Sequence, residues 1–151
     1  MAIDTTLDLA AVHPSTRPVA RYAVAVARIA LGLIFFVFGL NGFLNFIPQP
    51  PPAAPIPEAA MSLGMAFMKS GYLFQLIKGT EVLGGLLLLG NRFVPLALAL
   101  LAPVVVNIFA FHAFLLSDGI VLATVILALE IGLAWAYRKA YRPMLAARVQ
   151  P

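Results

Sequence analysis

Hydrophobic residues form four long runs along the chain, separated by short polar segments. The runs cover residues 20–47, 72–90, 93–116 and 120–138. Each is long enough to cross the hydrocarbon core of a bilayer as a helix, which takes about 20 residues. The pattern therefore predicts an all-α integral membrane protein built as a four-helix bundle.

The segment between the first two runs has a different pattern. It begins with a proline-rich stretch, which favours an extended backbone, and Pro57-Glu58 then suits the start of a helix over about 57–70. Met61, Met65 and Met68 share one face of that helix. We expect a short extracytoplasmic interfacial helix lying on the membrane surface. A lid over a cavity is the alternative, since methionine suits either role.

Composition supports the membrane assignment. The 151 residues are 62% hydrophobic and 11% charged, against about 25% charged residues in soluble domains. There is no cysteine, which excludes disulfides, thiolate nucleophiles and cysteine-ligated metal clusters. The net charge of +4 comes from basic residues at the ends of the runs. That placement is a topology signal, so we expect no nucleic-acid partner.

The basic residues also predict the orientation. Four spans put both termini on one side, and most basic residues near span ends fall there: Arg17, Arg21, Arg92, Arg138, Lys139, Arg142 and Arg148. The other side has Lys69 and the acidic turn at Asp118. The positive-inside rule then places both termini in the cytoplasm. We expect a polar cytoplasmic tail at 1–19, one transmembrane domain at 20–138 and a basic cytoplasmic tail at 139–151.

Several polar residues fall inside the predicted spans. With this topology they gather in the outer half of the bundle, and they form the candidate ligand-binding set Gln75, Lys78, Glu81, Asn107, His112 and Asn41. Polar groups within hydrocarbon are costly and often mark functional sites. Lys78 and Glu81 stand three residues apart and suit an intrahelical ion pair. That pair either neutralises two charges so that the helix can insert, or forms part of a ligand or proton site.

Two further charges, Arg28 in the first span and Glu130 in the fourth, reach similar depths. We expect them to form a structural polar pair between those helices. His112 has no metal-binding spacing around it, and no catalytic triad or nucleotide-binding motif is present. We therefore expect no metal, no catalytic residues and no independent enzyme activity.

Part of the chain resembles the DoxX family of small four-helix bacterial membrane proteins. The residues that carry the resemblance are Arg28-x3-Gly32-Leu33-Ile34-Phe35 with Phe38-Gly39 and Asn41, Gly71-Tyr72, Glu81-Val82-Leu83-x-Gly85-Leu86-Leu87-Leu88, and Pro103-x3-Asn107 with Phe111-His112. The resemblance implies a four-helix bundle in the bacterial inner membrane. One branch of the family is associated with quinone-linked sulfur oxidation and others with redox-stress complexes. The lack of cysteine argues against a thiol-based role.

Three functions are open from the sequence. The first is a membrane subunit of a redox-linked complex that binds a quinone or another small lipophile in the polar pocket. The second is a non-catalytic structural or assembly subunit of a larger membrane complex, and the third is a small-solute or proton transporter. The expected partners are the lipid bilayer and either other membrane proteins or further copies of this chain.

Overall fold

The described residues of the computed structural model, 16–48 and 55–145, form helices joined by short turns. The elements are α1 (Thr16–Leu44), α2 (Glu58–Lys69), α3 (Leu73–Leu89), α4 (Val94–Phe114), α5 (Ile120–Ala136), α6 (Arg138–Tyr141) and the short 3-10 helix η1 (Pro143–Leu145). Each hydrophobic run became one helix, with ends within about a turn of the predicted ones. Much of both predicted tails and of the proline-rich stretch lies outside the described residues.

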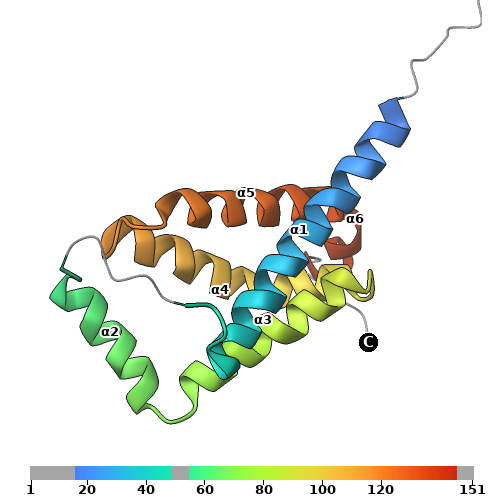
Figure 1. The fold of residues 1–151 in the computed structure, drawn as a ribbon. Helices are drawn as coiled ribbons and strands as arrows, with labels where there is room; N and C mark the ends of the chain where they lie inside the picture. Colours follow the sequence, from blue (N-terminus) through green and yellow to red (C-terminus); the bar gives the residue numbers. More distant parts are fainter. Residues whose placement is uncertain (1–15, 49–54, 146–151) are drawn as a thin grey trace, which may run out of the picture.

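The four long helices pack on one another in a ring. α1 has its most extensive contact with α3, α3 also contacts α4, α4 contacts α5, and α5 returns to α1. Figure 1 shows α4 and α5 side by side, with α1 crossing diagonally beside α3. The all-helical fold predicted from the sequence is confirmed for the described residues.

The sequence predicted four membrane-spanning helices. Among the described residues, fewer helices are long enough to cross a membrane. α1 and α4 are long and apolar enough, and α2 with α3 qualifies as a third span only if the 88° bend between them is accepted as a break within it. α3 and α5 are apolar but have 17 residues each. α3 stops at the Gly90 turn, and α5 starts only after Gly119, which has a positive φ of 89°.

The contact between α1 and α3 depends on glycine. A Cβ atom on Gly85 of α3 would lie 2.6 Å from the backbone nitrogen of Phe36 in α1. On the α1 side, a Cβ on Gly39 would lie 2.9 Å from the backbone nitrogen of Val82. Because small residues let helix backbones approach closely, this contact brings Lys78 and Glu81 of α3 against α1.

Buried apolar side chains fill the space between the helices. Leu31 and Phe35 of α1, Leu88 of α3 and Leu101 of α4 belong to one cluster with Leu133 of α5. Many large hydrophobic side chains instead face outward on the same helices: Ile29, Leu33, Leu83, Leu86, Leu96, Val106, Val125 and Ile131. Helices that are apolar on both the inner and the outer face are typical of a protein embedded in lipid.

α2 stands apart from the four long helices (Figure 1). It lies near the end of the molecule where α1 and α4 finish, and Ala60 is its buried residue. Met61, Met65 and Met68 are all exposed, as expected for one shared face. The helix is therefore present where the sequence predicted it, with an uncovered methionine surface.

Candidate functional site

The Lys78–Glu81 ion pair is the centre of the candidate site. The Lys78 Nζ atom donates to Glu81 Oε2 at 2.8 Å and to Oε1 at 3.1 Å. Glu81 is 3% exposed. The lysine stem lies on Gly42 of α1, where a Cβ would come within 2.6 Å of Lys78 Cγ. Because Gly42 has no side chain, the stem of Lys78 has room to turn back toward Glu81.

A small cavity of about 220 Å³ borders this pair. His112 from α4 lines it together with Lys78 and Glu81, and the remaining lining is apolar: Ile34, Phe35, Phe38, Ile108, Leu122 and Ile126. All four long helices therefore contribute to the cavity. Its chemistry is a charged pair and one imidazole within an otherwise hydrophobic wall.

The His112 ring is held in place by its surroundings. Its Nδ1 atom lies 3.0 Å from the carbonyl oxygen of Leu116. Because a carbonyl oxygen only accepts hydrogen bonds, Nδ1 carries the proton, and in the neutral ring Nε2 is then an acceptor. The ring also packs on Gly119, where a Cβ would lie 2.8 Å from Cε1. The turn before α5 thus fixes the imidazole.

Not all of the predicted ligand-binding residues meet at this cavity. Lys78, Glu81 and His112 line it, whereas Gln75 and Asn107 are exposed and do not. Asn107 lies on the outer face of α4, because the buried face of that helix carries Leu101 and Val105.

Asn41 is buried but also lies outside the cavity lining. Its Oδ1 atom accepts a hydrogen bond from the backbone N–H of Ile47 at 2.7 Å. The side chain therefore satisfies the backbone where the chain leaves α1.

The structure does not bring Arg28 and Glu130 together. Arg28 Nη1 donates to the carbonyl oxygen of Leu88 and, at 3.4 Å, to that of Leu89. These carbonyls belong to the last turn of α3, where the helix dipole attracts a cation, and the Leu88 oxygen also accepts from the backbone N–H of Asn91 at 3.2 Å. The guanidinium is thus held by the C-terminal end of α3. The predicted pair considered only that Arg28 and Glu130 reach similar depths in the membrane.

Glu130 faces a different space, an apolar groove of about 520 Å³ between α4 and α5. The residue is 6% exposed, and its Oε2 atom has no hydrogen-bond partner among the described residues. Tyr141 lines the same groove and donates from its hydroxyl to the carbonyl oxygen of Pro95 at 2.9 Å. Burial, with the nearby Glu130 charge, raises the pKa of Tyr141 above its usual value of 10.0, so the hydroxyl stays protonated.

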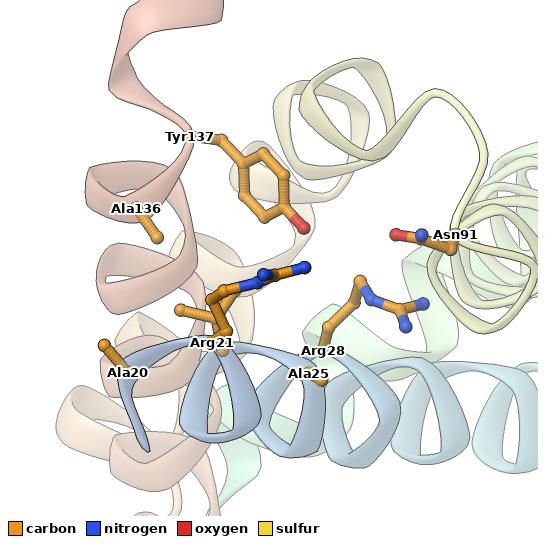
Figure 2. A pocket seen from close by; sticks show the side chains of 8 residues that line it. Ala20, Arg21, Ala25, Arg28, Asn91, Ala136 and Tyr137 are labelled. Carbon is orange, nitrogen blue, oxygen red and sulfur yellow. The ribbon is translucent and has the colours of Figure 1, made fainter. Parts of the chain in front are cut away.

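A further cavity, of about 450 Å³, lies at the opposite end of the molecule from α2. Arg21, Arg28, Asn91 and Tyr137 line it (Figure 2). The sequence analysis used Arg21 for topology and Arg28 for a structural pair, and it placed neither Asn91 nor Tyr137 in a site. The clustering of Arg21, Asn91 and Tyr137 at span ends on one side was the available signal.

No three His, Asp or Glu side chains of the described ranges cluster as metal ligands would, and we assign no metal to the site. Comparison of the chain with models of known families, with curated proteins and with solved structures gave no match. The interpretation of the site therefore depends on its geometry.

Proposed function

We propose that the chain is a DoxX-like protein of the bacterial inner membrane in which α1, α3, α4 and α5 all cross the bilayer. The ring of contacts among these helices and their apolar outer faces support this proposal. A 17-residue helix is about 26 Å long, close to the roughly 30 Å hydrocarbon core. In this arrangement both termini are cytoplasmic and α2 lies at the extracytoplasmic surface.

Within that protein, the Lys78–Glu81 cavity binds the headgroup of a quinone or another small lipophile, as part of a redox-linked membrane complex. The observation that carries this is the ion pair bordering a cavity with an imidazole among its lining residues. An ammonium group has three protons to donate, and within the described ranges Glu81 is the acceptor that Lys78 contacts. Lys78 is therefore suited to donate to a carbonyl oxygen, and His112 Nε2 to accept from a hydroxyl.

The size of the cavity limits the ligand. Its volume of about 220 Å³ is below the roughly 300–1,000 Å³ typical of pockets for drug-sized molecules. A single ring with two oxygen substituents matches this volume better than a whole isoprenoid quinone does. The tail of such a ligand would lie outside the cavity, along the apolar outer faces of the helices.

Binding of decylubiquinone to the detergent-purified protein tests the proposal. We expect the quinone to raise the thermal midpoint of wild type and of the exposed control Gln75→Ala. The paired variant Lys78→Met with Glu81→Gln keeps the side-chain lengths and buries no lone charge, so it should fold. It should bind about tenfold more weakly, because a hydrogen bond from a charged donor is lost. Equal binding by this folded variant and wild type would refute the assignment.

A structural or assembly subunit is the second function that an observation favours. The ion pair itself lies within α3, but the lysine stem fills the space over Gly42 of α1, as a packing role between α1 and α3 requires. This function predicts no effect of quinone on wild type. It also predicts that the paired variant loses association with its membrane partners, or with its own copies, in native mass spectrometry.

A further inference from the structure

The cavity of about 450 Å³ beside the N-terminal part of α1 has many hydrogen-bond donors in its lining. Arg21 and Arg28 come from α1, Asn91 from the α3–α4 turn and Tyr137 from the end of α5. Figure 2 shows the Tyr137 hydroxyl and the Arg21 guanidinium pointing into the space between α5 and that turn. Arg28 extends along the same space toward α3, and Asn91 faces it from the opposite side.

Among the described residues, no carboxylate lines this positively charged cavity. In the described part of the chain the salt bridge within 4 Å is Lys78–Glu81, so neither Arg21 nor Arg28 is paired with an acid there. Arg28 is 9% exposed and has neutral carbonyl oxygens as its partners. Burial of a cation is costly without a counter-charge, and an anion in the cavity would supply one.

The donor set matches the chemistry of phosphate. Guanidinium groups bind phosphate oxygens through paired, charge-assisted hydrogen bonds, and the Tyr137 hydroxyl and the Asn91 amide add neutral donors. The cavity volume of about 450 Å³ leaves room for a phosphate with a substituent. Basic pockets between helices at the cytoplasmic side of a membrane are suited to anionic lipid headgroups.

We propose that this cavity binds a phosphate group, either the phosphodiester of an anionic phospholipid or a soluble phosphate compound. The proposal shares no residue with the Lys78–Glu81 cavity, so each can fail without the other. Its lipid form requires the bilayer placement given above, whereas its soluble form does not.

Native mass spectrometry of the detergent-purified full chain tests the proposal, with phosphatidylglycerol and zwitterionic phosphatidylcholine offered in equal amounts. We expect wild type to retain phosphatidylglycerol preferentially. Arg21→Gln should reduce that retention about tenfold, because one charge-assisted hydrogen bond is lost. Tyr137→Phe should reduce it by a smaller factor. Arg21 is exposed and Tyr137 is half-buried, and Tyr137→Phe keeps the ring that packs against the core, so these variants should fold.

Arg92→Gln is the matched control. Arg92 is exposed, follows Asn91 in the same turn and does not line the cavity. It removes one positive charge from this end of the molecule and should leave retention unchanged. A parallel thermal-shift arm uses inorganic phosphate and glycerol 3-phosphate. Stabilisation by either compound that Arg21→Gln abolishes would assign the site to a soluble phosphate.

The proposal is overturned if neither inorganic phosphate nor glycerol 3-phosphate raises the thermal midpoint and the two lipids are retained equally. It is also overturned if Arg21→Gln and Arg92→Gln reduce retention by the same factor. That result would mean that only the net charge near the membrane surface matters.

Discussion

The two buried glutamates differ in the hydrogen-bond and charge partners that their positions give them. Glu81 and Glu130 are each 6% exposed or less and lie on apolar helices. Glu81 has the Lys78 ammonium at 2.8 Å, whereas Glu130 Oε2 has no partner among the described residues. Removing the cation beside Glu81 and removing the Glu130 carboxyl group should therefore affect stability in opposite directions.

Lys78→Met should destabilise the fold. It leaves the Glu81 carboxylate buried without its cation, and breaking one side of a buried pair costs roughly 3–5 kcal/mol. Adding Glu81→Gln should restore most of that stability, because no lone charge remains. Thermal or denaturant unfolding in detergent measures both variants. Equal stability of the single and double variants would contradict a coupled pair.

Glu130→Met should stabilise the fold. The substitution keeps an unbranched side chain of similar length. It removes a buried polar atom that the described residues leave unpaired, a cost of about 1–3 kcal/mol. Glu58→Gln is the control, because Glu58 is exposed on α2 and its loss should change little. If unfolding measurements show Glu130→Met to be less stable than wild type, Glu130 has a partner in the folded protein.

At the scale of the helices, the contact between α1 and α3 depends on how closely two backbones approach. Within the helices, a glycine is needed where two backbones touch and can be replaced where its face is open. Gly85 faces the α1 backbone, whereas a Cβ on Gly132 of α5 would meet nothing within 4 Å. Composition alone does not distinguish these two glycines, since both occur in apolar runs.

Gly85→Ala should separate α1 from α3. The new methyl group would lie 2.6 Å from a backbone atom that cannot rotate away, and overpacking of this kind costs about 1–3 kcal/mol. Gly132→Ala should be neutral or stabilising by up to about 1 kcal/mol, because alanine favours the helix more than glycine does. Thermal unfolding of the two variants checks the contrast. Similar changes would show that the contact tolerates a wider spacing.

At the scale of the whole molecule, the number of membrane spans decides which side of the membrane each helix end faces. The chain has no cysteine, so single cysteines can report on topology without interference. Lys69, Arg92, Asp118 and Lys139 are all exposed and lie near helix ends. Each can therefore be replaced without disturbing the core.

With four spans, a membrane-impermeant maleimide should label Lys69→Cys and Asp118→Cys from the extracytoplasmic side of cells whose outer membrane has been permeabilised. Arg92→Cys and Lys139→Cys should react only in inverted vesicles. The physical basis is the excess of basic residues on the side assigned to the cytoplasm. Labelling of both Asp118→Cys and Lys139→Cys from outside would mean that α5 does not cross the membrane.

The sequence by itself determined where the helices are and which surfaces are apolar. Hydrophobic runs, prolines and turn glycines act over a few neighbouring residues, so the predicted ranges agree with α1 to α5 to within about a turn. The i, i+3 spacing of Lys78 and Glu81 likewise predicted an ion pair that the structure contains. Both features are local, and local geometry follows from the repeat of the helix.

Only the tertiary structure decided which polar groups meet. A depth comparison treats helices as parallel rods and ignores their rotation about their own axes. It grouped Asn107 with Lys78, Glu81 and His112 in one binding set, although Asn107 lies on the outer face of α4. It paired Arg28 with Glu130, although the carbonyl groups at the end of α3 accept from Arg28. Helix rotation and the partners at helix ends depend on packing between segments that are distant in the chain, which hydrophobic periodicity does not encode.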